Sequence, residues 1–94
     1  MFCLHIRCHI RPEKIAEFRK ISLLLMENTR MEPGCLSYDI GEEEPGVVAW
    51  IERWDTEEAL EAHKTTRYYL DSEAAMNGFF LAAADVQRLD PFTS

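Results

Sequence analysis

The chain has 94 residues, 47% of them hydrophobic, and carries 17 acidic against 10 basic side chains, for a net charge of −7. This length predicts a single domain, spanning residues 1–94, that can fold without metal ions or disulfide bonds. The negative charge repels nucleic-acid phosphates and anionic lipid surfaces, so we expect neither nucleic acid nor a membrane as a partner.

The cysteines and the amino terminus indicate a cellular compartment. Cys3, Cys8 and Cys35 are odd in number and show no C-x-x-C spacing, so they predict neither a disulfide framework nor a zinc ribbon. The first residues lack the pattern of a signal peptide, and no window approaches the roughly 18 apolar residues of a membrane span. We therefore expect a cytoplasmic protein with reduced thiols.

The first third of the chain predicts a strand followed by a long helix. Residues alternate between an apolar and a mixed face from Phe2 to Ile10, and this period of two is typical of a strand. Apolar residues then recur at steps of three or four over residues 12–30, which predicts a helix. Pro33 and Gly34 end it, because proline cannot continue a helix and glycine can turn the chain.

The remainder of the chain predicts a hairpin, two short helices and a last strand. The runs CLSYDIG and VVAWIERW flank an acidic turn and are rich in strand-forming residues. Asp55 with Glu58 forms a predicted capping pair for a helix over TEEALEAH, and Thr65 or Thr66 is expected to cap the next helix. A final strand is predicted within ADVQRLD.

The order β-α-β-β-α-α-β predicts an α+β fold, a ferredoxin-like split β-α-β sheet with the helices on one face. The strand VVAWIERW is apolar on both faces, however. Its two faces are Val48, Trp50 and Trp54 on one side, and Val47, Ala49 and Ile51 on the other. A sheet face open to solvent would carry more polar side chains than this strand does. We therefore expect a second copy of the chain to cover it, giving a homodimer.

Three segments carry a resemblance to a known family. EPGCLSY, followed by ERW and then EALEAH, resembles the antibiotic-biosynthesis-monooxygenase domain family, and the similarity extends from Phe2 to about Pro91. The resemblance implies a dimeric α+β barrel. It also implies one of three activities: cofactor-independent oxygenation of quinols and polycyclic phenols, haem degradation, or isomerisation of a phosphorylated autoinducer sugar.

His63 is the first candidate for chemistry. It follows Ala59 by four residues and Leu60 by three, so it belongs to the inward face of its helix, at the carboxyl end. An imidazole there could accept a proton from a phenolic or enolisable substrate, or it could simply bond a backbone carbonyl at the helix end. The family resemblance, which places a pocket histidine at this position, favours the proton acceptor.

Other candidates surround His63 in the sequence. Tyr68 and Tyr69 are about 100° apart on a helix, so only one can face a pocket, and Tyr69 has the better claim as a catalytic residue. Tyr68 stays a substrate-binding candidate, and Trp50 could stack on a flat substrate, although core packing is the commoner use of such a tryptophan. Arg67 could bind a phosphate.

Further polar residues are assigned structural roles. Glu52 and Arg53 are expected to form an ion pair or an inter-strand contact. His5 and His9, with Arg7 between them, are expected to line the dimer-facing surface against Glu52 or Asp39; the alternative is an anion site formed by Arg7 and His5.

Metal and cofactor binding are not expected. Four residues of strand separate His5 from His9 by roughly 13 Å, too far for both to bind one ion. Haem-degrading members of the family carry an asparagine, a tryptophan and an iron-binding histidine, where this chain has Ile6, His63 and Glu73. No G-x-G-x-x-G or P-loop fingerprint is present either.

The sequence therefore favours a monooxygenase that oxidises a quinol or polycyclic phenol with dioxygen and without a cofactor. The alternatives are the sugar-phosphate isomerase, which the segment HKTT with Tyr69 resembles locally, and a non-catalytic dimeric protein that binds a small molecule.

Overall fold

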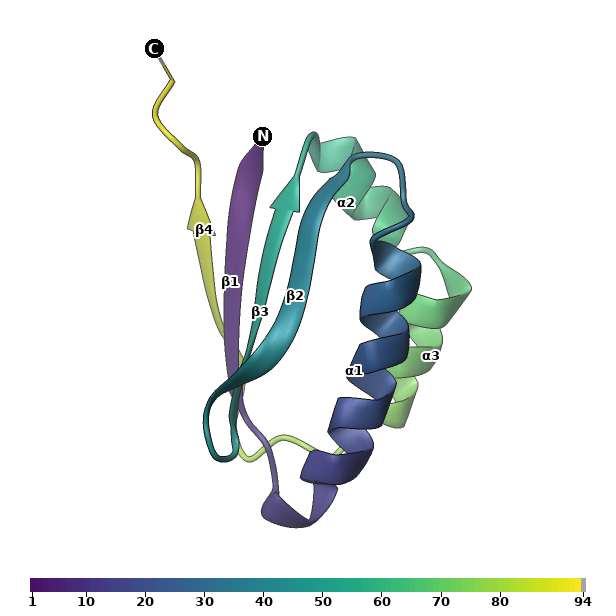
Figure 1. Ribbon diagram of the computed structural model, residues 1–94, viewed down its shortest axis with the longest axis vertical. Helices are drawn as coiled ribbons and strands as arrows, with labels where there is room; N and C mark the ends of the chain where they lie inside the picture. Colours follow the sequence, from purple (N-terminus) through teal and green to yellow (C-terminus); the bar gives the residue numbers. More distant parts are fainter. Residues whose placement is uncertain (94) are drawn as a thin grey trace.

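A computed structural model describes residues 1–93, and it shows one four-stranded antiparallel sheet with the helices packed on a single face (Figure 1). The strands are β1 (Phe2–His9), β2 (Cys35–Glu44), β3 (Val47–Trp54) and β4 (Asp85–Leu89). A 3-10 turn (Pro12–Lys14) leads into α1 (Ile15–Thr29), and α2 (Glu57–His63) and α3 (Arg67–Ala75) follow the hairpin. The predicted α+β, ferredoxin-like architecture is confirmed.

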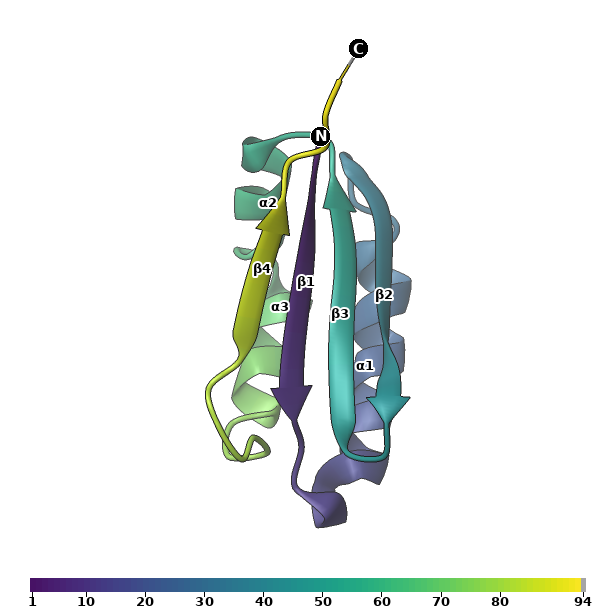
Figure 2. The same cartoon turned by 90° about the vertical axis from the view of Figure 1, so that its left-hand side faces the viewer.

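The strand order is β2-β3-β1-β4, so the central strands β1 and β3 pair with each other and each takes an edge strand on its other side. Figure 2 shows the sheet from its open face, with the helices behind it. The order follows from two crossovers, one through α1 and one through α2 and α3, which both pass over the same face. Within the described residues, no helix has the length and hydropathy that crossing a bilayer requires.

The core lies between the sheet and the helices, as the alternation of β3 predicts. Trp50 and Trp54 both point to the helices, and the Phe18 ring of α1 packs edge to face on Trp50 with centroids 5.5 Å apart. The largest fully buried side chains include Trp54, Tyr38 and His63. A histidine therefore occupies a place where apolar side chains are the rule.

Threonines cap both short helices. Thr56, whose backbone is extended, accepts the Ala59 N–H at 3.1 Å, so the predicted Asp55–Glu58 cap of α2 is wrong by one residue. Thr66 accepts the Tyr69 N–H at 3.3 Å and starts α3, which confirms one of the two predicted positions.

The open face of β3 exposes less apolar surface than its sequence suggests. Val47 and Ala49 are each only 6% exposed, and Ile51 is 50% exposed. Arg7 of β1 bonds Glu43 of β2 at 3.2 Å, and because these strands flank β3, the ion pair crosses its outer face.

The predicted partners of the strand face with His5, Arg7 and His9 were therefore wrong. Glu52 faces the helices instead of the open face of the sheet, since it alternates in register with Trp50 and Trp54. Asp39 is bound to Arg30 at 2.7 Å.

Candidate functional site

A cavity of about 300 Å³ opens between the sheet and the helices α2 and α3. Apolar side chains of β1 and of the helices form most of its wall. Its polar lining consists of Tyr38, Glu52, His63, Lys64, Tyr69, Ser72 and Glu73. An apolar cavity with a few convergent polar groups is the usual form of a small-molecule site.

His63 is fixed in the wall of this cavity. Its side chain is 2% exposed, and its Nδ1 lies 2.8 Å from Oε2 of Glu32. Aromatic rings enclose the imidazole, with centroids at 4.8 Å for Tyr69, 5.0 Å for Trp54 and 5.5 Å for Tyr38. The packed-histidine alternative required a backbone carbonyl as partner, whereas the structure provides a carboxylate.

Glu32 comes from the turn that follows α1, and it is mostly buried. The same Oε2 atom also accepts a hydrogen bond from the Tyr68 hydroxyl. Burial, with the Glu32 carboxylate next in importance, raises the pKa of Tyr68 to about 12, so this phenol remains a donor. Two donors thus converge on one carboxylate oxygen, and Tyr68 supports Glu32 without lining the cavity of His63.

Tyr69 does line that cavity, on the turn of α3 that Thr66 starts. Burial, followed by the carboxylate of Glu73 one helical turn away, raises the pKa of Tyr69 above its ordinary value. The phenol is therefore protonated at neutral pH and can donate a hydrogen bond to a ligand oxygen.

Glu52 is a second acidic group in the cavity wall, and the ion pair with Arg53, one of the two predicted contacts, is not formed. Adjacent strand residues point to opposite faces, so Glu52 is only 4% exposed while Arg53 faces outward. Its Oε1 accepts the indole N–H of Trp54 at 2.8 Å. Burial raises the pKa of Glu52, which makes it a candidate proton-transfer group beside His63.

The substitution Glu52→Gln is expected to stabilise the fold near neutral pH. Because the folded-state pKa lies above the ordinary value of 4.5, ionisation is disfavoured in the folded protein, and stability falls as the pH rises from that ordinary value through the folded one. Glutamine keeps the acceptor for Trp54 without the charge. We expect a gain of about 1 kcal/mol at pH 7.5, or roughly 4–8 °C in Tm, and none at pH 4. Thermal melts at both pH values test this, and an equal loss at both would refute it.

The structure gathers three of the five predicted site residues. His63, Tyr69 and Trp50 line the cavity, whereas Tyr68 lies outside its lining and contacts His63 through Glu32 and by ring packing, with centroids 6.5 Å apart. The side chain of Arg67 is 87% exposed and bonds Asp71 at 3.4 Å on the outer side of α3, away from the cavity. Glu32 and Glu52 also belong to the site, but the sequence did not identify either of them as a site residue.

The side chains around the cavity are poorly suited to bind a metal ion or haem. Within residues 1–93, no group of three or more His, Cys, Asp or Glu side chains has the arrangement that could hold a metal ion. Ile6, His63 and Glu73, the positions where haem-degrading proteins differ from this chain, all line the cavity. A glutamate stands in place of the iron ligand, and His63 is engaged with Glu32, so these residues do not fit haem.

Comparison with known sequences identifies related proteins. The family model described as antibiotic biosynthesis monooxygenase matches residues 1–75. The Bacillus subtilis protein named "Putative monooxygenase YcnE" is 28% identical over 92 residues, which are 96% of this chain and 97% of that protein. The Synechocystis protein named "Uncharacterized protein sll1783" is 36% identical over 62 residues, 64% of this chain and 42% of that protein. The match therefore spans less than half the length of the Synechocystis relative.

Solved structures share the fold over almost the whole chain. Rv0793 from Mycobacterium tuberculosis superposes with a TM-score of 0.89 at 26% identity, covering 99% of this chain and 96% of that one. A structure described as an antibiotic biosynthesis monooxygenase gives a TM-score of 0.89 at 28% identity, with coverage of 99% and 100%. Sequence and structure point to the same group of proteins.

Proposed function

This chain belongs to the antibiotic biosynthesis monooxygenase family, and from its cavity we propose that it is a monooxygenase that oxidises a quinol or polycyclic phenol with dioxygen, without a cofactor. The observation that carries the proposal is the buried pair of His63 and Glu32 at the wall of a largely apolar cavity. A carboxylate behind an imidazole is a common way to prepare the outer nitrogen as a proton acceptor.

The Glu32 carboxylate can only accept hydrogen bonds, so it selects the tautomer of His63 that carries its proton on Nδ1. Nε2 then holds a lone pair, and it makes no hydrogen bond to any of the described residues. We propose that Nε2 accepts the phenolic proton of the substrate. The resulting phenolate is rich in electrons and can reduce dioxygen directly.

The reaction balances without an added reductant. One oxygen atom of dioxygen enters a new C–O bond of the substrate, and the displaced hydrogens leave with the second oxygen atom as water. The substrate supplies all of the electrons. The protein needs only to bind the substrate, take the proton and exclude bulk water.

The remaining wall of the cavity suggests how a substrate is held. Trp50 offers an aromatic face for a flat ring, and the Tyr69 phenol can donate to a substrate oxygen. A cavity of about 150 Å³ can hold benzene, so a cavity of about 300 Å³ has room for a ligand larger than a single ring.

Oxygen uptake with a panel of hydroquinones and anthrones tests the activity. At least one compound should be consumed faster with protein than without it, with saturation at rising substrate concentration. Compounds that raise the Tm without any protein-dependent uptake would instead identify a non-catalytic binding protein.

The isomerase alternative gains no support from the cavity. Its phosphate site would need Arg67, which lies on the outer side of α3. The cavity wall carries the carboxylates of Glu52 and Glu73. The one ammonium that residues 1–93 contribute to its lining, that of Lys64, lies 3.7 Å from Glu61. A phosphorylated ketose should therefore not raise the Tm. A rise that Arg67→Gln abolishes would restore that alternative.

We also propose that two copies associate through the open face of the sheet, in the cytoplasm. The half-exposed Ile51 on that face and the dimers of the family support the association, and the free thiols Cys3, Cys8 and Cys35 support the location. Light scattering should give twice the chain mass of 10.9 kDa. A monomer at micromolar concentration, or an Ile51→Lys variant that associates unchanged, would count against this interface.

A further inference from the structure

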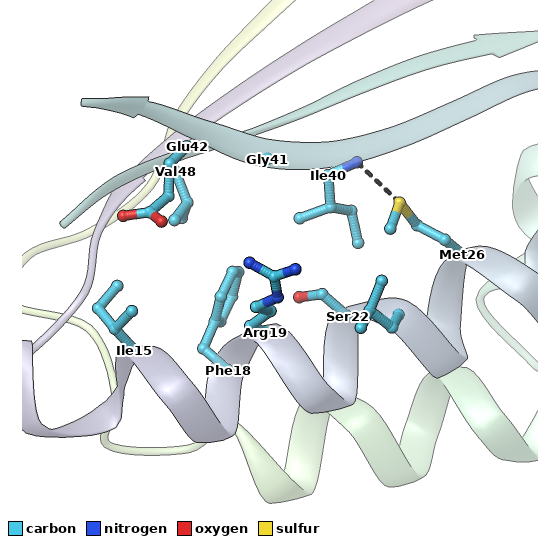
Figure 3. Close-up of a pocket in the computed structure, with 10 residues that line it drawn as sticks. Ile15, Phe18, Arg19, Ser22, Met26, Ile40, Gly41, Glu42 and Val48 are labelled. Atoms are coloured by element: carbon cyan, nitrogen blue, oxygen red, sulfur yellow. Dashed lines mark hydrogen bonds between the residues drawn. The ribbon is translucent and has the colours of Figure 1, made fainter. Parts of the chain in front are cut away.

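A second cavity, of about 260 Å³, lies between α1 and the edge strand β2 (Figure 3). Among the described residues, none that lines it also lines the cavity of His63. We propose that this second cavity is a separate binding site for a small monocarboxylic acid with an apolar body.

Apolar side chains from both sides form the walls. Ile15, Phe18 and Met26 contribute from α1, and Ile40 and Val48 contribute from the sheet. The Sδ atom of Met26 accepts the Ile40 N–H at 3.2 Å, which ties the helix to the edge strand at one end of the cavity. Since about 150 Å³ accommodates benzene, this space suits a single ring with one substituent.

Ser22 provides the first polar contact for a ligand. Its side chain is among the buried polar groups at 4% exposure, and its Oγ has no hydrogen-bond partner within the described residues. Figure 3 shows the hydroxyl pointing from α1 into the space below Ile40. A buried hydroxyl without a partner is destabilising, and a ligand oxygen at this point would satisfy it.

Arg19 provides a positive charge at the same place. It precedes Ser22 by three residues and so shares its side of α1, and both side chains line this cavity. No carboxylate or hydrogen-bond acceptor in residues 1–93 engages it. A free guanidinium and a donating hydroxyl in the wall of one cavity match a carboxylate group.

Glu42 limits the charge that the ligand can carry. Its Oε2 accepts the Gly46 N–H at 3.2 Å, so the carboxylate is held by the turn between β2 and β3, at the far wall of the cavity. It would repel a second negative group. The site should therefore prefer a monocarboxylate over a dicarboxylate of the same size.

The walls of the two cavities meet at a pair of aromatic rings. Phe18 lines the second cavity, Trp50 lines the cavity of His63, and their centroids lie 5.5 Å apart, edge to face. The proposal does not depend on the oxygenase activity, since no residue that binds the carboxylate takes part in that chemistry.

The test is a titration of the ¹⁵N-labelled protein with benzoate, followed by amide chemical shifts, with benzyl alcohol and phthalate as comparison ligands. Benzoate should cause saturable shifts at Ser22, Ile40 and Gly41, and should bind at least about tenfold more tightly than either comparison ligand. Arg19→Gln should weaken benzoate at least about tenfold and leave benzyl alcohol unchanged.

Arg67→Gln is the matched control, because it removes the same charge from the surface of α3 and should leave benzoate binding intact. Three results would overturn the proposal: no saturable shift, shifts centred on His63 and Tyr69 that Arg19→Gln does not change, or equal binding of benzoate and benzyl alcohol. Arg19 is exposed, so its variant should fold, and Ser22→Ala gives a second variant that should weaken benzoate while keeping the Tm.

Discussion

Replacing His63 by alanine should lower the kcat/KM of quinol oxidation by about 10²- to 10⁴-fold, the usual range for loss of a positioned proton acceptor. His63 is the only histidine that lines the cavity among residues 1–93, and its imidazole is held by Glu32 and packed against four aromatic rings. Initial rates of oxygen uptake across a range of substrate concentrations measure the loss. Circular dichroism must show that the variant is folded. If His63→Ala is unfolded, His63→Gln replaces it in the rate measurements.

The substitution Glu32→Gln is the companion experiment. It keeps the imidazole but removes the charge that orients it, so we expect a smaller loss, of about 10- to 100-fold. Because the two residues act as a unit, the double variant should be little worse than His63→Ala alone. Wild-type rates for His63→Ala on every oxidised substrate would show that the imidazole is not the proton acceptor.

Replacing Gly34 by alanine should destabilise the fold by roughly 2–5 kcal/mol. Gly34 has φ of +85°, where a side chain is strained, and an added Cβ would lie 2.6 Å from the Cβ of Ala59 on α2. The Gly34 carbonyl also accepts the Asp55 N–H at 2.8 Å. The turn that presents Glu32 is thus packed directly on the helix that presents His63, and urea denaturation measures the loss.

Gly78→Ala is the matched control for this effect. Gly78 has nearly the same φ, +86°, but an added Cβ would meet no atom within 4 Å. It should therefore cost only the backbone strain, about 1–2 kcal/mol. Equal losses for the two variants would show that the contact between the turn and α2 is unimportant.

Local patterns were sufficient to predict the order of elements and the inward faces. The period of two in VVAWIERW placed Trp50 and Trp54 correctly because a strand has only two faces. The predicted cap of α2 was wrong because Asp55, with Glu58, and the next residue, Thr56, are both suitable helix caps. The backbone conformation at Thr56 decides between them. Such a choice depends on dihedral angles that residue types do not specify.

A site residue was predictable only where the spacing within a single helix or strand determines its position. His63 and Tyr69 follow from helical spacing, whereas the partner of His63 lies 31 residues earlier, in a turn that sequence patterns assign only a helix-ending role. Glu52 could have been found, since it alternates with two inward tryptophans. Arg67 lies away from the cavity because the first turn of α3 directs its side chain outward, toward Asp71.

Turnover of a hydroquinone or anthrone under ¹⁸O₂ tests the central claim most directly. The proposed reaction places one ¹⁸O atom in the organic product and the other in water, at a rate that falls with His63→Ala. A product without ¹⁸O, accompanied by labelled hydrogen peroxide, or labelling that proceeds equally without His63, would contradict the assignment of His63 as the proton acceptor of a monooxygenase.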